Sequence, residues 1–184
     1  MLINLLLKVV KELDKNKIPY IIIGGQAVNL HGIVRATQDI NITLGIDTGK
    51  MEELLKIISK LNLIFLKENP EEFAKKFWVM PVFEKKSKIK IDFAFSFSPF
   101  EKNAIKRAVK VKIKNQIVKF CSIEDLIVFK IIAGRAIDLF DVRNIILRNS
   151  NFDRKYVLKW IKLFEDTTGE NYKERLDKII ISIK

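Results

Sequence analysis

Three short stretches of the sequence carry residues whose types and spacing suit metal-dependent phosphate chemistry. Gly24 and Gly25 follow an apolar run, where the absence of side chains would let backbone amides approach a phosphate. Asp39 and Asn41 lie two residues apart in the next apolar segment, and Asp92 lies in a third. Carboxylate and carboxamide oxygens are ligands that Mg²⁺ or Mn²⁺ prefers, so we expect Asp39, Asn41 and Asp92 to form a metal site.

Strands would bring these acidic residues together, because successive side chains of a strand point to opposite faces. In the strand predicted over residues 39–44, Asp39 and Asn41 share one face, while the isoleucines and leucine between them enter the core. In the strand predicted over residues 88–95, Asp92 points away from its apolar neighbours. Two such strands can aim their carboxylates at one point beside the two glycines.

The remaining sequence reads as a mixed α/β front half followed by a helical back half. Helical spacing of apolar residues predicts helices over residues 2–16, 26–31, 51–61, 123–133, 138–147, 153–164 and 171–183. Apolar runs bounded by turn residues predict strands over residues 20–23, 39–44, 64–66, 78–84, 88–95, 108–113 and 117–120. The phenylalanines at positions 93, 95, 97 and 100 are expected in the core. The character changes near residue 121 without a flexible linker, so we expect an α+β core over residues 1–121 and a helical lobe over residues 122–184 packed on it.

The composition indicates a folded protein whose charge would suit an anionic partner. Of the 184 residues 48% are hydrophobic, which allows a sizeable core and excludes a disordered chain. The formal net charge of +12 favours nucleotides, RNA, DNA or an acidic protein as partners, and a general lysine bias explains the same charge without a partner. The single cysteine, Cys121, and the lack of a signal peptide or membrane-spanning run predict a cytoplasmic protein with no membrane contact.

Three other kinds of site do not fit the spacing. The segment over residues 45–51 lacks the spacing and the final Ser or Thr of a P-loop. The glycines at positions 24, 25 and 32 do not match the dinucleotide-binding fingerprint. One histidine and one cysteine cannot form a zinc-ligand cluster.

The first half of the chain resembles motif I of the polymerase-beta-like nucleotidyltransferase superfamily. The resemblance rests on residues 22–41, Ile-Ile-Gly-Gly-Gln-Ala-Val-Asn-Leu-His-Gly-Ile-Val-Arg-Ala-Thr-Gln-Asp-Ile-Asn. The single-domain members that the chain is similar to include the toxins of AbiE-type toxin–antitoxin systems, many of which read Arg-x-Thr-x-Asp before the acidic pair, as here. The resemblance implies a nucleotidyltransferase fold with a small mixed β-sheet flanked by helices. It also implies nucleotide binding by Gly24, Gly25, Arg35 and Thr37, and catalysis by Asp39 and Asp92.

The back half resembles the same group over residues 124–143, which combine a leucine- and isoleucine-rich helix, a lysine and Arg-x-x-Asp-x-x-Asp. The resemblance implies that Lys130 contacts the triphosphate and takes part in catalysis. It also implies that Arg135 binds nucleotide and that Asp138 and Asp141 line or brace the cleft. From spacing alone, Lys130 is also consistent with a surface lysine. The helical spacing of Arg135, Asp138 and Asp141 is equally consistent with a structural salt-bridge network as with a nucleotide-binding role.

Asn41 departs from the family pattern, because the second residue of the acidic pair is normally an aspartate. An asparagine offers a metal one carbonyl oxygen and no negative charge. Three interpretations stay open: a non-catalytic nucleotide-binding or RNA-binding protein, an active enzyme that holds one ion well or recruits Glu84, or a deliberate substitution. We expect Mg²⁺-dependent transfer of a nucleotidyl group from an NTP to a hydroxyl of RNA such as tRNA, or of a protein. The chain is then a candidate toxin with an antitoxin partner.

Overall fold

The computed structural model describes residues 1–183 and divides the chain into two compact units. The sheet unit comprises Met1–Gln26 and Ala36–Cys121, and the helical unit comprises Ala27–Arg35 and the chain from Ser122 onward. The sequence pattern predicts a boundary near residue 121. Residues 27–35 associate with the C-terminal helices, whereas the sequence pattern groups them with the first part of the chain.

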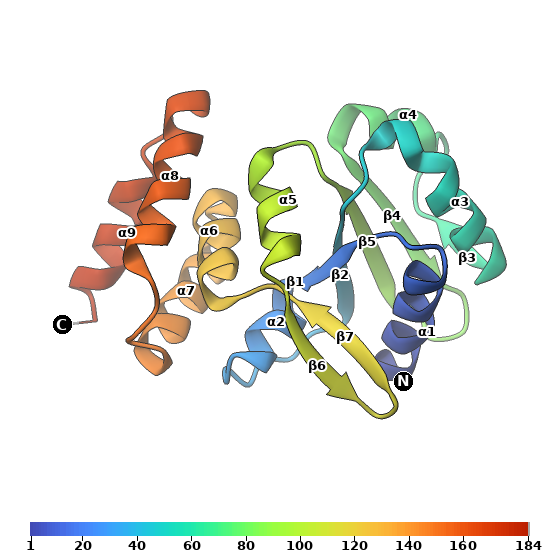
Figure 1. Ribbon diagram of the computed structural model, residues 1–184, viewed down its shortest axis with the longest axis horizontal. Coiled ribbons are helices and arrows are strands. Elements are labelled where there is room, and N and C mark those ends of the chain that lie inside the picture. The colour runs from blue at the N-terminus through green and yellow to red at the C-terminus, as the bar shows by residue number, and fades with distance from the viewer. Residues whose placement is uncertain (184) are drawn as a thin grey trace. The chain divides into compact units, whose positions relative to one another are not determined.

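The sheet unit contains a mixed seven-stranded sheet among the described residues (Figure 1). Its strands are β1 (Tyr20–Ile23), β2 (Asp39–Leu44), β3 (Leu63–Phe65), β4 (Val79–Glu84), β5 (Lys90–Phe95), β6 (Val109–Ile113) and β7 (Gln116–Phe120). Their order across the sheet is β3-β4-β5-β2-β1-β7-β6. The pairs β2–β5 and β1–β7 are parallel, and the other neighbours are antiparallel. This is the expected α+β architecture.

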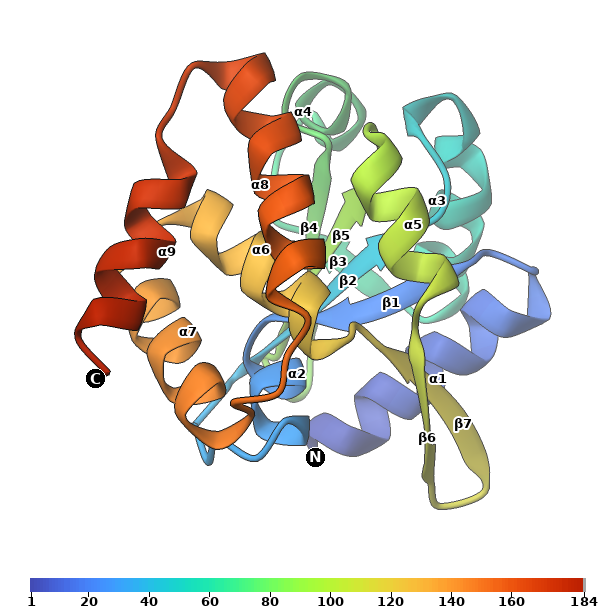
Figure 2. The same ribbon diagram turned by 60° about the vertical axis from the view of Figure 1, so that its left-hand side comes forward.

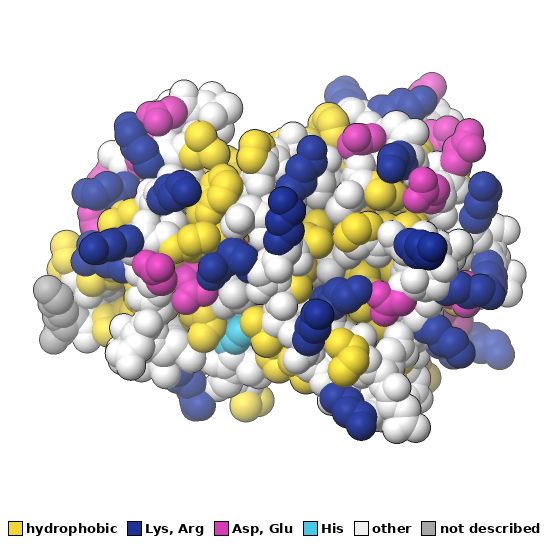
Figure 3. All heavy atoms as spheres, viewed as in Figure 1, with side chains coloured by type: hydrophobic (Ala, Val, Ile, Leu, Met, Phe, Trp, Pro, Cys, Tyr) yellow, Lys and Arg dark blue, Asp and Glu magenta, His cyan; other side chains and the backbone are white. Residues whose placement is uncertain are grey.

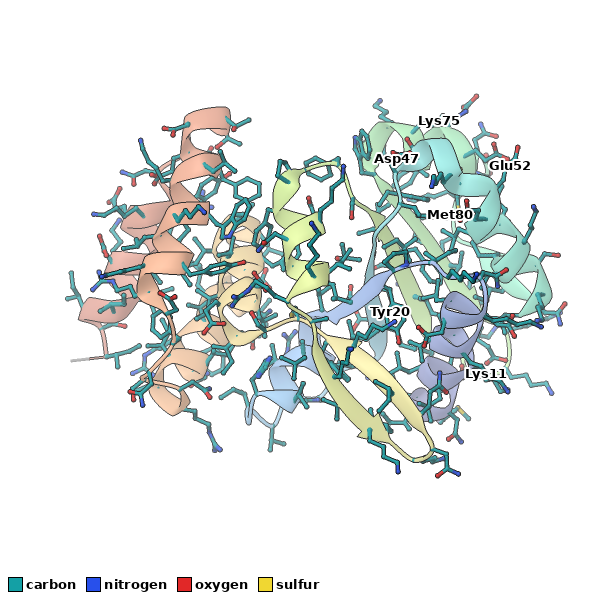
Figure 4. All side chains as sticks on the ribbon, in the orientation of Figure 1. Lys11, Tyr20, Asp47, Glu52, Lys75 and Met80 are labelled. Atoms are coloured by element: carbon teal, nitrogen blue, oxygen red, sulfur yellow. The ribbon has the colours of Figure 1, made fainter. Side chains whose placement is uncertain are left out.

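Alternation along β2 sorts its side chains as predicted. Ile40, Ile42 and Leu44 are fully buried, while Asp39 and Asn41 on the opposite face are half-buried. The helices of this unit are α1 (Leu2–Lys15), η1 (Thr48–Lys50), α3 (Met51–Lys60), α4 (Pro70–Phe77) and α5 (Pro99–Lys106). Helix α1 is amphipathic and buries one apolar stripe, consisting of Leu5, Leu6, Val9, Val10 and Leu13. Tyr20 and Met80, labelled in Figure 4, lie fully inside the same unit.

Two features of the sheet unit differ from the sequence-based expectation. Helix α5 was not predicted, although Ser98 and Glu101 form a capping box at its start and Pro99 occupies its first turn. Phe97 was expected in the core but is 60% exposed. It lies beyond the end of β5, where the alternation that buries Phe93 and Phe95 no longer applies.

The helical unit is built from α6 (Ile123–Ala133), α7 (Ala136–Arg148), α8 (Arg154–Thr168) and α9 (Tyr172–Ile181), with part of α2 (Gly24–Leu30). Figure 2 shows α8 and α9 lying side by side. Ser122 caps α6 by accepting a hydrogen bond from the Asp125 amide, as its sequence predicts. Gly134 ends α6 in the left-handed conformation. Among residues 1–183, the structure contains no helix with the length and apolar character needed to span a membrane.

Candidate functional site

The register of two parallel strands assembles the candidate site in the sheet unit. Asn41 of β2 lies opposite Asp92 of β5, and Asp39 lies opposite Lys90. Residues directly opposite each other point to the same face of a sheet, so Asp39, Asn41 and Asp92 share one face. The two carboxylates are diagonal neighbours across the strand pair, which is close enough for the charge of one to influence the other.

The diglycine bend lies beside these residues because β1 pairs with β2. Ile23, the last residue of β1, is opposite Asn41, and Gly24 follows it with a φ of +67°. A side-chain carbon at Gly24 would lie 2.8 Å from the Asn41 amide nitrogen, and one at Gly25 would lie 2.7 Å from the Thr37 hydroxyl. Both separations are too short for real atoms, so the two glycines also make room for the side chains that approach the acidic strand.

Asp39 is held in place by two neighbouring polar groups. The Thr37 hydroxyl donates to Asp39 Oδ1 at 3.0 Å, and Gln26 Nε2 donates to the Asp39 backbone carbonyl at 3.2 Å. The contact from Thr37 engages one carboxylate oxygen, and the other has no hydrogen-bond partner within residues 1–183. Gln26 was not identified from the sequence, and its position directly after the two glycines is the signal that points to it.

The electrostatics of the site favour a bound cation. Burial raises the pKa of Asp92 above its usual value, the nearby charge of Asp39 raises it further, and Lys90 partly opposes both effects. A divalent cation would offset the repulsion between the two carboxylates, and the oxygens of Asp39, Asp92 and Asn41 are the hard donors that Mg²⁺ or Mn²⁺ requires. These residues therefore fit one such ion.

Recruitment of Glu84 as a replacement acid is wrong. The pairing of Pro81 with Asp92 places odd-numbered residues of β4 on the face of the site, so Glu84 points to the opposite face. Its carboxylate accepts a hydrogen bond from the Ser87 amide at 2.6 Å, which stabilises the turn between β4 and β5. Within residues 1–183 there is no cluster of three or more His, Cys, Asp or Glu side chains that could hold a metal.

The second set of expected residues forms an ion-pair network inside the helical unit. Lys130 Nζ lies 3.0 Å from Asp138 Oδ1 and 2.6 Å from Asp141 Oδ2, and all three side chains are at least 95% buried. Lys130 is therefore not a surface lysine. Arg35 also binds Asp141 at 2.5 Å, and Arg135 binds Asp138 at 2.5 Å. Burial opposes ionisation of Asp138, but the hydrogen bonds from Arg135 and Lys130 outweigh it and lower the pKa of that carboxyl.

The comparisons with known proteins agree with this architecture. The solution structure of the antibiotic-resistance factor ANT(2'')-Ia is 16% identical, with a TM-score of 0.62 over 90% of this chain and 92% of that one. The lincosamide antibiotic adenylyltransferase LnuA, with lincomycin bound, is 16% identical, with a TM-score of 0.53 over 76% of this chain and 93% of that one. An antigenic nucleotidyltransferase-like protein from Paracoccidioides brasiliensis is 15% identical, with a TM-score of 0.55 over 86% and 84%. At this identity, the likenesses establish the fold.

The family assignment comes from the sequence itself. No curated protein matches the chain. Residues 1–162 match the family described as nucleotidyltransferase of unknown function (DUF6036), and this match includes both the acidic strands and the ion-pair network. The chain therefore belongs to this nucleotidyltransferase family.

Proposed function

We propose that this protein transfers a nucleotidyl group from an NTP to a hydroxyl group of RNA, such as tRNA, or of a protein. The observation that carries the proposal is the β2–β5 register, which sets Asp92 opposite Asn41 and diagonal to Asp39 beside the diglycine bend. Membership in a nucleotidyltransferase family supports the reaction type. Two adjacent carboxylates and a diglycine bend at the start of α2 would supply what such a transfer needs.

In the proposed mechanism, Asp39 and Asp92 would hold a Mg²⁺ or Mn²⁺ ion, and Asn41 would add a neutral oxygen. When bound, the ion orients the triphosphate and offsets the charge that develops on the leaving pyrophosphate. The acceptor hydroxyl oxygen bonds to the α-phosphorus while the bond from that phosphorus to the β-phosphate oxygen breaks, and pyrophosphate leaves with the electron pair. Asp92 would also help to activate the acceptor by accepting the hydroxyl proton.

The phosphates of the nucleotide would contact the backbone of Gly24 and Gly25, where α2 begins. Thr37 supports the site through its hydrogen bond to Asp39. Lys130 and Arg135 are bound to carboxylates within the helical unit, so we assign them a bracing role there and no direct contact with phosphate. Arg35 has the same role through Asp141.

RNA is the favoured acceptor because the chain carries a net charge of +12. The related structures of ANT(2'')-Ia and LnuA contain adenylyl-2''-tobramycin and lincomycin, respectively, so the fold accepts chemically different hydroxyl compounds. The AbiE-type resemblance adds a role as a toxin with an antitoxin protein as its partner. Growth arrest on expression of the wild-type protein, relieved by Asp39→Asn, would support that role.

The proposed reaction is tested by incubating the purified protein with each labelled NTP, total RNA and Mg²⁺ or Mn²⁺. We expect label in the RNA fraction for the wild type and at least a hundredfold less for Asp39→Asn or Asp92→Asn, because each variant removes a charged donor. Label transfer that survives both substitutions would disprove the assignment of the site. Label in the protein fraction alone would identify a protein acceptor.

Asn41 supports a second candidate function, a catalytically inactive protein that still binds nucleotide or RNA. A missing carboxylate weakens at least one metal position, because a carboxamide contributes no charge. In that case the wild type would bind NTP without transferring label, and Asn41→Asp would restore transfer. Equal transfer by wild type and Asn41→Asp would exclude this candidate.

A further inference from the structure

A dense set of positive charges lies on two consecutive elements of the sheet unit. Residues 102–114, Lys-Asn-Ala-Ile-Lys-Arg-Ala-Val-Lys-Val-Lys-Ile-Lys, contain six basic residues and no acidic residue. They run from the middle of α5 through β6. The side chains of Lys102, Lys106, Arg107, Lys110, Lys112 and Lys114 are all exposed, and we call them the basic surface of α5 and β6.

The geometry of β6 places two of these lysines on one face of the strand. Lys110 and Lys112 alternate along the strand, so they point to one face and are spaced by roughly 7 Å. This spacing is comparable with that of successive phosphates along an extended nucleic-acid strand. Lys114 follows in the turn after β6, where its φ is +54° and its amine donates to Asn4 Oδ1 at 2.8 Å. Lys110 is also directly opposite Lys119 of β7, whose amine is paired with Asp14 Oδ1 at 2.7 Å.

Local structure explains only part of this charge. Lysines on an edge strand such as β6 discourage pairing with another sheet edge, and Lys106 in the last turn of α5 is favoured by the helix dipole. Neither effect explains Lys102, and Asp14 offsets the charge of Lys119 but not that of Lys110. Within residues 1–183, Lys102, Lys106, Lys110 and Lys112 form no salt bridge. Their charges are therefore available to a partner.

Figure 3 shows dark blue basic side chains over α5 and the β6–β7 hairpin on one face of the sheet unit. We propose that the basic surface of α5 and β6 binds the phosphates of an RNA strand, and that this strand is the acceptor in the proposed reaction. The inference rests on the proposed function for the identity of the acceptor. Extended RNA fits better than a folded acidic protein because the positive charges follow one another along α5 and β6 with no acidic residue between them.

The test compares two charge-matched variants of the full chain. The surface variant replaces Lys102, Lys106, Lys110 and Lys112 with Gln. The control variant replaces four exposed lysines on other elements of the sheet unit, Lys50, Lys56, Lys75 and Lys85, with Gln. Binding of a fluorescent 20-nucleotide single-stranded RNA is measured by anisotropy over a range of NaCl concentrations, and thermal unfolding of each variant confirms that it is folded.

We expect the surface variant to bind this RNA at least about tenfold more weakly than wild type at 100 mM NaCl. The slope of log K against the logarithm of the NaCl concentration should be smaller in magnitude by roughly 3, because each of the four lost phosphate contacts contributes about 0.7. The control variant should stay within about threefold of wild type. Equal weakening of both variants, no binding by the wild type, or tighter binding of duplex DNA or phosphatidylserine vesicles than of RNA would overturn the inference.

The outcome is separable from that of the proposed function. Asp39→Asn should lose label transfer and keep wild-type affinity for RNA, because Asp39 is not part of the basic surface. If the surface variant loses RNA binding and the wild type binds RNA but transfers no label, the basic surface would be supported as an RNA-binding site and the proposed reaction would be contradicted. Label transfer to RNA that the surface variant retains in full would contradict the surface alone.

Discussion

The carboxyl group of Asp92 contributes to the proposed site at the expense of folding stability. Its half-buried position and the charge of Asp39 both raise its pKa, so the folded protein favours the neutral acid relative to the unfolded chain. The pKa of Asp92 is 3.8 in the unfolded chain and higher in the folded protein. Ionisation of Asp92 therefore lowers the free energy of unfolding progressively as the pH rises from 3.8 through the folded-state pKa, and this decrease is complete above the folded-state pKa.

Asp92→Asn should therefore raise the Tm at pH 7 without metal by roughly 1–3 °C, a small shift because the half-exposed carboxyl is partly screened by water. The gain should disappear below about pH 3.8, where both states of the wild type are protonated. Addition of Mg²⁺ should raise the Tm of the wild type and leave that of the variant unchanged, because only the former keeps both carboxylates. Glu68→Gln removes the same charge from an exposed loop and is the control for the measurements of Tm against pH and against Mg²⁺ concentration. A lower Tm for Asp92→Asn at pH 7 would contradict the assigned pKa direction.

The hydroxyl of Thr37 orients Asp39, one of the two proposed metal-binding carboxylates. It engages Asp39 Oδ1 at 3.0 Å, and such contacts to a metal ligand commonly change metal affinity by about 10- to 100-fold when removed. We expect Thr37→Val to weaken Mn²⁺ binding about tenfold, and Thr37→Ser to stay within about threefold of wild type because it keeps the hydroxyl. Calorimetric titration with Mn²⁺ measures the metal affinity of each variant. Identical affinities for the Val and Ser variants would show that the hydroxyl does not position Asp39.

At the scale of elements, helices α6 and α7 are joined by buried charges as well as by apolar packing. Lys130 of α6 contacts Asp138 and Asp141 of α7, and these side chains are almost fully removed from water. Removing one member of a buried ion pair leaves the other charge desolvated and uncompensated. Arg35 and Arg135 would still contact the two aspartates and reduce that cost.

Lys130→Met should lower the free energy of unfolding by about 3 kcal/mol, near the lower end of the range for a broken buried pair. Urea denaturation measures the change, and Lys155→Met on the exposed face of α8 should alter it by less than about 0.5 kcal/mol. Unchanged stability together with a large increase in the KM for NTP would contradict the bracing role and favour direct contact with phosphate.

The whole molecule carries 34 basic and 22 acidic side chains, and its net charge of +12 produces self-repulsion in the folded state. Raising NaCl from 20 to 300 mM should increase the Tm by a few degrees because the salt screens this repulsion. The two four-lysine variants described above have a net charge of +8 and should show a smaller increase. A Tm that is independent of salt for all three proteins would indicate that the charges are too dispersed to repel one another.

The sequence determined most of the elements because their signals are local. The alternation in residues 39–44 predicts which side chains of β2 are buried, and the apolar run ending at Gly24 predicts β1. Helix α5 was missed because it has only eight residues and begins at a proline, although its capping box is visible in the sequence. Phe97 was misplaced because a strand pattern does not mark the residue at which the strand ends.

Only the tertiary structure decided which residues meet. The sequence provides Asp39 and Asp92 but not the register that places Asp92 opposite Asn41, because strand pairing joins residues that are far apart in the chain. It also left Lys130 open between the surface and a ligand contact, and packing of α6 against α7 buries it against two aspartates. Local propensity and alternation are properties of neighbouring residues, whereas burial, register and ion pairing depend on long-range contacts, and for this reason the elements were predictable and the geometry of the site was not.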